Sequence, residues 1–134
     1  MTFVKLVSVY GSMALCFLLV DLLWLGVFAK GFYQKQLSHL MAEQVYWPGA
    51  LMFYFIYIAG ILVFAVSPAL AVHALSRALL LGALLGFLAY ATYELTNWAI
   101  IRDWPAGIVA LDLAWGTVLT AVTAGVGYVV AQRF

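Results

Sequence analysis

Three carboxylic acids lie inside long apolar stretches of this sequence, at Asp21, Glu94 and Asp112. An acid at the centre of a membrane-spanning helix costs roughly 2.5–3.5 kcal/mol on insertion scales, so such residues are candidates for function. From their distances to the ends of the apolar stretches, we expect all three at one end of a helix bundle and in one leaflet. The structural alternative is that they only hydrogen-bond to neighbouring groups and hold the bundle together.

Two of the acids begin matching four-residue segments. Asp21-Leu-Leu-Trp24 recurs as Asp112-Leu-Ala-Trp115, and a glycine follows each segment within two residues. Positions three apart lie on one face of a helix, so we expect each acid beside its own indole. An indole N–H donates and a carboxylate accepts, so such a pair partly satisfies a buried acid. The match indicates an inverted repeat, with coincidence as the alternative.

The stretch around Glu94 carries polar side chains on one helix face, at Tyr90, Glu94 and Asn97. Gly82 and Gly86 lie on the same side, one and two turns earlier. Glycines four apart let helix backbones approach closely. We therefore expect this face to pack inward, so that polar groups from the first, third and fourth apolar stretches meet along one seam.

The tryptophans are distributed unevenly. All five belong to the end of the bundle that holds the acids, at Trp24, Trp47, Trp98, Trp104 and Trp115. An ordinary aromatic belt marks both membrane interfaces. One end of the bundle is therefore predicted to be acidic and rich in indole, while the other is plain hydrocarbon.

The elements that position these residues are predicted to be four membrane-spanning helices, because about 20 apolar residues are needed to cross a bilayer. The four stretches are residues 3–29, 48–66, 78–98 and 107–131. Residues 30–47 have the apolar spacing of a short amphipathic helix in the membrane interface, with a solvated helical loop as the alternative. The short connections make consecutive helices antiparallel. The predicted fold is a single all-α domain, an integral membrane four-helix bundle with both termini on one side.

Composition excludes several classes of protein. Apolar residues make up 68% of the 134 residues and charged residues 8%, against about 25% charged in soluble domains. The net charge of +1 argues against nucleic acid as a partner, because a basic stripe is absent. The single cysteine forms no intramolecular disulfide, and neither a cofactor nor a metal is expected. The minor alternative to the absence of a metal is a divalent cation held by the oxygen atoms of the three carboxylates.

Basic residues do not decide the orientation. The side of the termini carries Lys5, Arg77 and Arg133, and the opposite side carries Lys30, Lys35 and Arg102. This is a tie by the positive-inside rule, which counts only lysine and arginine. We expect both termini in the cytoplasm, and the tie also leaves dual topology open.

A set of short motifs distributed over the whole chain resembles a known family. The motifs are Asp21-Leu-Leu-Trp-Leu-Gly26, Gly31-Phe-Tyr33, Trp47-Pro48, Tyr93-Glu-Leu-Thr-Asn97, Asp103-Trp-Pro105 and Asp112-Leu-Ala-Trp-Gly116. Together they resemble the membrane-protein family labelled domain of unknown function 2177. One departure is Glu94, at a position associated with aspartate. The resemblance implies a small multi-pass protein of the bacterial inner membrane. The family's association with fatty-acid-modifying and oxidative-stress genes favours a lipid or another apolar small molecule.

The leading hypothesis is a module that binds or transports such a molecule in an acid- and tryptophan-lined cavity. The expected ligand-binding residues are Asp21, Trp24, Tyr93, Glu94, Asn97, Asp112 and Trp115. Aromatic walls with a few convergent polar groups are typical of small-molecule sites. Two alternatives remain: a structural or assembly subunit that contacts a second copy or another membrane protein, and a membrane-embedded lipid-modifying enzyme with carboxylates as general acid and base.

Overall fold

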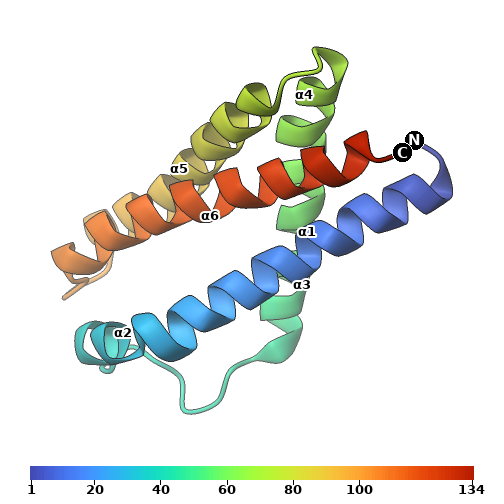
Figure 1. Ribbon diagram of the computed structural model, residues 1–134. Coiled ribbons are helices and arrows are strands. Elements are labelled where there is room, and N and C mark those ends of the chain that lie inside the picture. Colours follow the sequence, from blue (N-terminus) through green and yellow to red (C-terminus); the bar gives the residue numbers. More distant parts are fainter.

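The computed structural model describes residues 1–134 and contains helices but no strands (Figure 1). The α-helices are α1 (Phe3–Leu23), α2 (Lys30–Leu37), α3 (Trp47–Ile61), α4 (Ser67–Ala71), α5 (Leu75–Ile100) and α6 (Ala106–Gln132). Two π-helical turns, η1 (Trp24–Phe28) and η2 (Leu62–Val66), continue α1 and α3. Four continuous helices are long and apolar enough to cross a membrane: Phe3–Phe28, Trp47–Ala71, Leu75–Ile100 and Ala106–Gln132. The predicted all-α membrane bundle is confirmed.

The second spanning helix is longer than its sequence indicates. We expected Ser67-Pro68 to end it, but the helix continues to Ala71. Proline has no N–H to donate and its ring clashes with the preceding turn, which normally breaks a helix. Here the π turn η2 lies directly before it, and the N–H of Ser67 bonds to the Leu62 carbonyl, five residues back. This widened turn lets the chain pass Pro68 without a break.

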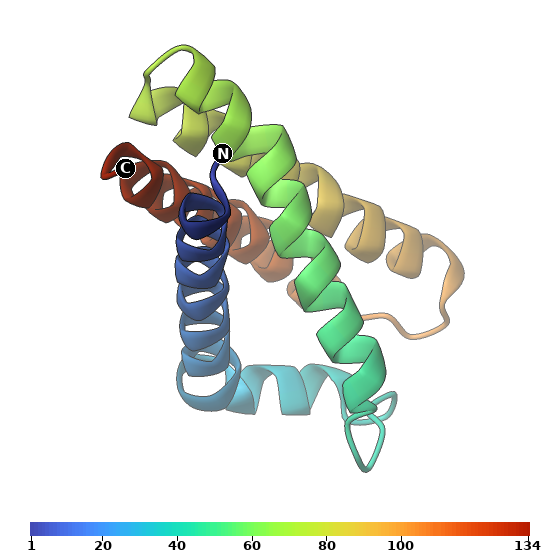
Figure 2. The same cartoon turned by 90° about the vertical axis from the view of Figure 1, so that its right-hand side faces the viewer.

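The short helix α2 lies between the first two spans, as predicted, and runs across the end of α1 (Figure 2). Its partly buried residues are Tyr33, Gln36 and Leu37, which share one face. It is shorter than the apolar spacing suggested. Residues 40–46, which contain the remaining apolar positions, are not helical and are exposed.

Helices α5 and α6 form a tightly packed antiparallel pair. A Cβ atom on Gly86 would lie 2.2 Å from the carbonyl oxygen of Gly116 on α6, and one on Gly82 would lie 2.8 Å from the Cβ of Ala124. Only glycine permits so close an approach of two helix backbones. The inward-facing glycine side predicted for this helix is thus present. It also fixes the height of Glu94, two turns after Gly86 on the same face.

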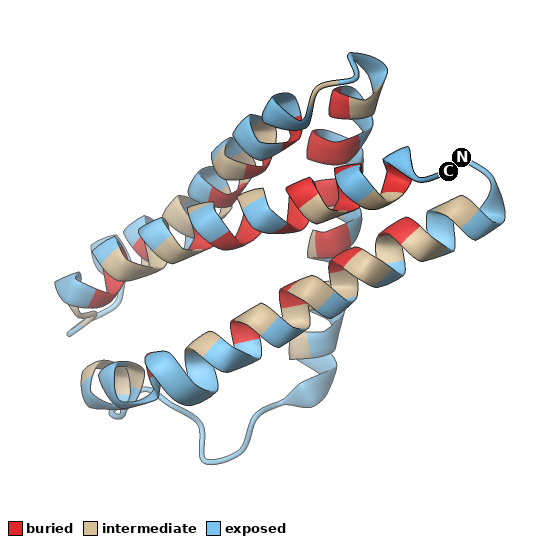
Figure 3. Cartoon of the chain, in the orientation of Figure 1, coloured by how far each residue is buried: buried red, intermediate tan, exposed pale blue.

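Burial divides the bundle into two ends (Figure 3). Near the two termini, which lie together (Figure 1), Val9 and Met13 of α1 pack with Val66 and Tyr128 in the core. We call this the terminal end. Toward α2 the helices diverge, and the first eleven residues of α3, residues 47–57, include no buried residue. We call this the α2 end. The three membrane acids lie there.

Candidate functional site

Asp21 continues the buried face of α1. Val9, Met13, Phe17 and Asp21 follow one another at intervals of four residues, and all are buried. The Asp21 carboxyl accepts one hydrogen bond from the Tyr54 hydroxyl of α3, at 3.1 Å, and another from the Trp115 indole N–H of α6, at 3.2 Å. Two neutral donors on two other spans therefore hold this acid in place.

The two acid–tryptophan segments pair crosswise, so the prediction that each acid lies beside its own indole is wrong. Trp115 of α6 donates to Asp21 of α1, and Trp24 reaches Asp112 only through Tyr33. The rings of Trp24 and Trp115 stack with centroids 4.3 Å apart and planes 9° from parallel. Trp24 keeps α-helical register with Asp21, but its ring stacks on Trp115 and its indole N–H donates to Tyr33. The repeat thus joins two helices to each other.

Tyr33 connects α2 to the acid cluster. Its hydroxyl donates to Oδ1 of Asp112 and accepts from the Trp24 indole at 3.2 Å. Burial raises the pKa of Tyr33 well above its usual value, and the hydrogen bond to Asp112 raises it further. The phenol therefore stays a neutral donor at physiological pH. It was not among the expected site residues, although its place on the inward face of the predicted interfacial helix was the available signal.

Glu94 is fully buried, with 0% of its surface exposed. One carboxyl oxygen, Oε2, accepts a hydrogen bond of 2.8 Å from the Trp104 indole in the loop before α6. The other oxygen, Oε1, is buried and has no hydrogen-bond donor beside it. The Asp112 carboxyl lies within hydrogen-bonding reach of Glu94. Two carboxyl groups can form that bond only if a proton or another donor lies between them.

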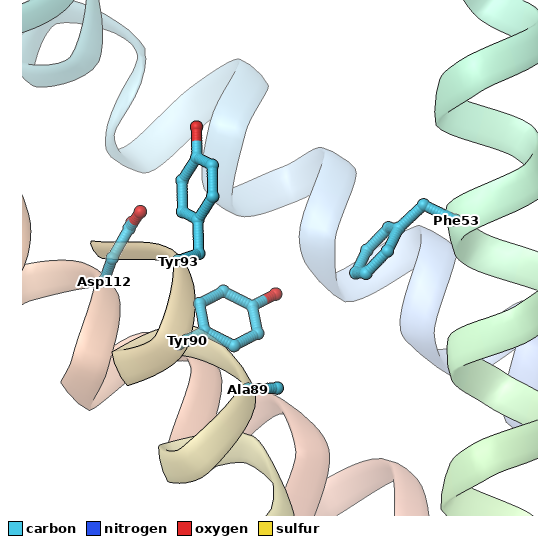
Figure 4. A pocket seen from close by; sticks show the side chains of 5 residues that line it. All are labelled: Phe53, Ala89, Tyr90, Tyr93 and Asp112. Atoms are coloured by element: carbon cyan, nitrogen blue, oxygen red, sulfur yellow. The ribbon is translucent and has the colours of Figure 1, made fainter. Parts of the chain in front are cut away.

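A cavity of about 320 Å³ adjoins this cluster, and its lining residues are Phe53, Ala89, Tyr90, Tyr93 and Asp112 (Figure 4). The walls are mainly aromatic, with the Phe53 ring of α3 facing Tyr90 of α5. Asp112 is the only acid in the lining and marks its polar end. The volume lies at the lower limit of the range of about 300–1,000 Å³ typical of small-molecule pockets.

Tyr90 owes its position to a glycine on the neighbouring helix. A Cβ atom on Gly116 would lie 2.1 Å from Cγ of Tyr90, so the ring rests directly on the α6 backbone. Tyr90 in turn forms an edge contact with Tyr57 of α3, at 6.4 Å between ring centroids. Close packing of α5 and α6 therefore builds one wall of the cavity.

The expected site residues lie in three places. Asp21, Trp24, Asp112 and Trp115 form one hydrogen-bonded and stacked cluster, with Glu94 next to Asp112. Tyr93 lines the cavity and meets the Trp104 ring edge-on at 5.8 Å. Asn97 is half-buried one turn further along α5 and forms none of the hydrogen bonds that reach the acids.

Three further residues of the site were missed or given no role from sequence: Phe53, Tyr54 and Trp104. Tyr90 was expected on the inward polar face, but its place in the cavity wall was not predicted. Phe53 and Tyr54 belong to an aromatic run in α3. Because α3 is apolar on all sides, its sequence pattern did not indicate which face turns inward. Trp104 had been assigned only to the aromatic end of the bundle. Arg102, a basic residue on this side of the bundle, is exposed, and the hydrogen bonds to the acids come from phenol and indole groups.

The side chains present do not form a metal centre. No group of three or more His, Cys, Asp or Glu residues lies close enough to hold a metal ion. His39 contacts the backbone carbonyl of Asp103 at 3.1 Å, away from the acids. The site therefore provides carboxyl groups as hydrogen-bond acceptors next to an aromatic cavity.

Comparison with known proteins agrees with this setting. A family model described as predicted membrane protein (DUF2177) matches residues 6–129, which confirms the resemblance drawn from the short motifs. No curated protein and no solved structure matches the chain.

Proposed function

The chain belongs to the DUF2177 family of predicted membrane proteins, and within that setting we propose that its α2 end binds a lipid or another apolar small molecule, as part of a carrier or transport function. The observation that carries the proposal is the aromatic cavity that ends on Asp112. Such sites combine apolar walls with a few convergent polar groups. The three acids with their tyrosine and tryptophan donors supply the polar groups here.

The unpaired oxygen of Glu94 also favours binding over a purely structural role. Acids that only hold helices together are expected to have both oxygens satisfied, because a buried acceptor without a donor costs about 1–3 kcal/mol. Asp21 meets that expectation, since each of its oxygens accepts a hydrogen bond. Glu94 does not, since Oε1 lacks a donor. A ligand that donates to the Glu94–Asp112 pair from the cavity, where Asp112 is exposed, would offset this cost.

Native mass spectrometry of the protein purified in mild detergent tests this proposal. The wild type is expected to carry a bound molecule of defined mass. Ala89→Phe places a ring in the cavity and should abolish this adduct. Ala59→Phe is the matched control, because Ala59 is exposed on α3 and does not line the cavity. A wild type without any adduct, or an adduct retained equally by both variants, would count against a cavity site.

A membrane-embedded enzyme is the second candidate, favoured by the contact between Glu94 and Asp112. Adjacent carboxyl groups in different surroundings suit general acid and base roles, one giving a proton and the other taking it. The same mass spectra discriminate the two functions after incubation with total membrane lipid. A carrier returns its ligand with unchanged mass, whereas an enzyme converts it to a product of different mass.

We further propose a bacterial inner-membrane location with both termini in the cytoplasm. The even number of candidate spans and the position of both termini at one end of the bundle (Figures 1 and 2) support a common side for the two ends. The side itself rests on a tied charge count, so it needs a direct measurement. Reporter fusions at Met1 and Phe134 should both give a cytoplasmic signal. Signals from opposite sides would remove the four-span topology, and mixed signals from each fusion would indicate dual topology.

A further inference from the structure

The hydrogen-bond donors around the acid cluster are almost all committed. The indole N–H groups of Trp24, Trp104 and Trp115 donate to Tyr33, Glu94 and Asp21. The hydroxyl groups of Tyr33 and Tyr54 donate to Asp112 and Asp21. Every one of these donors is used within the protein. Spare capacity at the acids themselves is therefore that of acceptors. The hydroxyl groups of Tyr90 and Tyr93, which line the cavity (Figure 4), are neutral donors that none of these hydrogen bonds uses.

That spare capacity is concentrated where the cavity ends. Asp112 lines the cavity, and the fully buried Glu94 beside it has an oxygen without a donor. The basic residues of this side of the bundle, Lys30, Lys35 and Arg102, are exposed. No basic residue lines the cavity, so an anionic group brought into it meets the Asp112 carboxylate without a cation in the wall. Like charges brought together at a binding site repel each other and disfavour the wrong ligand.

The walls favour the opposite charge. Phe53, Tyr90 and Tyr93 present aromatic rings to the cavity (Figure 4). The faces of such rings attract ammonium groups, most strongly where water is excluded. An ammonium group also brings several N–H donors, enough to reach both carboxyl groups at once. The cavity's small volume limits the enclosed part of the ligand to the head group and a short length of chain.

We propose that the cavity selects amphiphiles with a cationic ammonium head group and discriminates against carboxylate or phosphate head groups. This inference rests on the proposed binding function and specifies its ligand class. The head group lies against Asp112 and the aromatic walls, on the cavity side of the Glu94–Asp112 pair, and the apolar tail extends from the cavity toward lipid. A hydroxyl head group, which donates only one hydrogen bond, binds more weakly than ammonium.

Titration of tryptophan fluorescence in a neutral maltoside detergent tests the ligand class, with octylamine, 1-octanol and octanoate as probes of equal chain length. Saturable binding is defined as the signal lost in Ala89→Phe, which corrects for partitioning into micelles. We expect octylamine to bind at least about tenfold more tightly than octanoate, with 1-octanol between them. Asp112→Asn should weaken octylamine about tenfold and leave 1-octanol nearly unchanged.

The outcomes separate this inference from the function on which it rests. Equal affinity for the three probes would leave a binding cavity but overturn the ligand class, as would tighter binding of octanoate. An unchanged preference in Asp112→Asn would overturn the role of that acid. No saturable binding of any probe would overturn the binding function and the ligand class together. The order of affinities in the wild type, corrected with Ala89→Phe, decides the class even if Asp112→Asn does not fold.

Discussion

The terminal end and the α2 end are built from the same four helices but in opposite ways. At the terminal end, Met13 packs onto Gly127, and Thr123 satisfies its own hydroxyl by bonding to the Leu119 carbonyl of its own helix. At the α2 end, each acid depends on donors from other segments of the chain. Close packing at one end holds the helices together, so the other end can keep acids and a cavity between them.

The contrast between the packed core and the open cavity predicts unequal effects of the same substitution in the two places. Phe17 is fully buried between Tyr54 and Tyr57, whereas Phe53 is 48% exposed and lines the cavity. Phe17→Ala should destabilise the protein by about 3 kcal/mol, the lower end of the usual range for this change, because lipid replaces water as solvent. Phe53→Ala should cost less than about 1 kcal/mol and affect ligand binding instead. Thermal or denaturant unfolding in detergent measures both; equal losses would contradict this contrast.

The glycine contacts that join α5 to α6 should have the next largest effect. Gly86→Ala forces a Cβ against the Gly116 carbonyl oxygen, which is backbone and cannot move aside. We expect a loss of about 1–3 kcal/mol in the free energy of unfolding. Gly60→Ala is the control, because nothing lies within 4 Å of its added Cβ. If both variants unfold at the same temperature, the close helix approach does not contribute to stability.

A smaller effect is expected from the crossed tryptophan pair. Trp115→Phe removes the N–H that donates to Asp21 and keeps an aromatic ring against Trp24. Because Tyr54 still donates to Asp21, we expect a loss of only about 1 kcal/mol. Trp98→Phe, at an exposed position, serves as the control and should be neutral. If Trp115→Phe and the wild type give identical unfolding curves, the hydrogen bond from Trp115 to Asp21 does not contribute to stability.

The smallest expected effect concerns α2 and depends on pH. The pKa of Tyr33 is raised in the folded protein, so folding favours its protonated form. The hydrogen bond from Tyr33 to Asp112 should stabilise the folded protein by about 1 kcal/mol. This stabilisation is fully present below the pKa of an unfolded tyrosine, about 10, and is lost as the pH rises above that value. The stability difference between wild type and Tyr33→Phe should therefore be constant from about pH 7 to 9 and shrink at higher pH. A difference that grows above pH 10 would contradict the sign of the shift.

Sequence patterns predicted which residues gather at one end but not how they pair. Membrane acids and tryptophans carry a signal because each is costly or unusual in an apolar helix, so the cluster of Asp21, Asp112 and Trp115 was within reach. The crosswise pairing was not, because it depends on how α1 and α6 pack side by side, which short motifs do not specify. The role of Tyr54 was hidden for another reason. In α3 nearly every residue is apolar or aromatic, so periodicity does not indicate which face turns inward.

At Pro68 the sequence carries a strong local signal for a helix end, but the structure does not follow it. Proline ordinarily ends a helix, and the sequence therefore predicted a span ending at residue 66. The π turn at Leu62–Val66 lets the helix continue, and buried Ala65 and Ala69 keep both sides of the proline in the core. Packing at the terminal end thus decided a boundary that local preference had placed elsewhere.

Photolabelling in native membranes compares the two ends most directly. A long-chain alcohol that carries a diazirine at its head end can be crosslinked and mapped by peptide mass spectrometry, with unlabelled alcohol as competitor. The account predicts competable labelling at Phe53 and at Ala89–Tyr93, and only non-competable labelling at the apolar groove of the terminal end, which includes Leu79 and Val126. Competable labelling confined to that groove, or labelling spread evenly over lipid-facing residues, would contradict a ligand site at the α2 end.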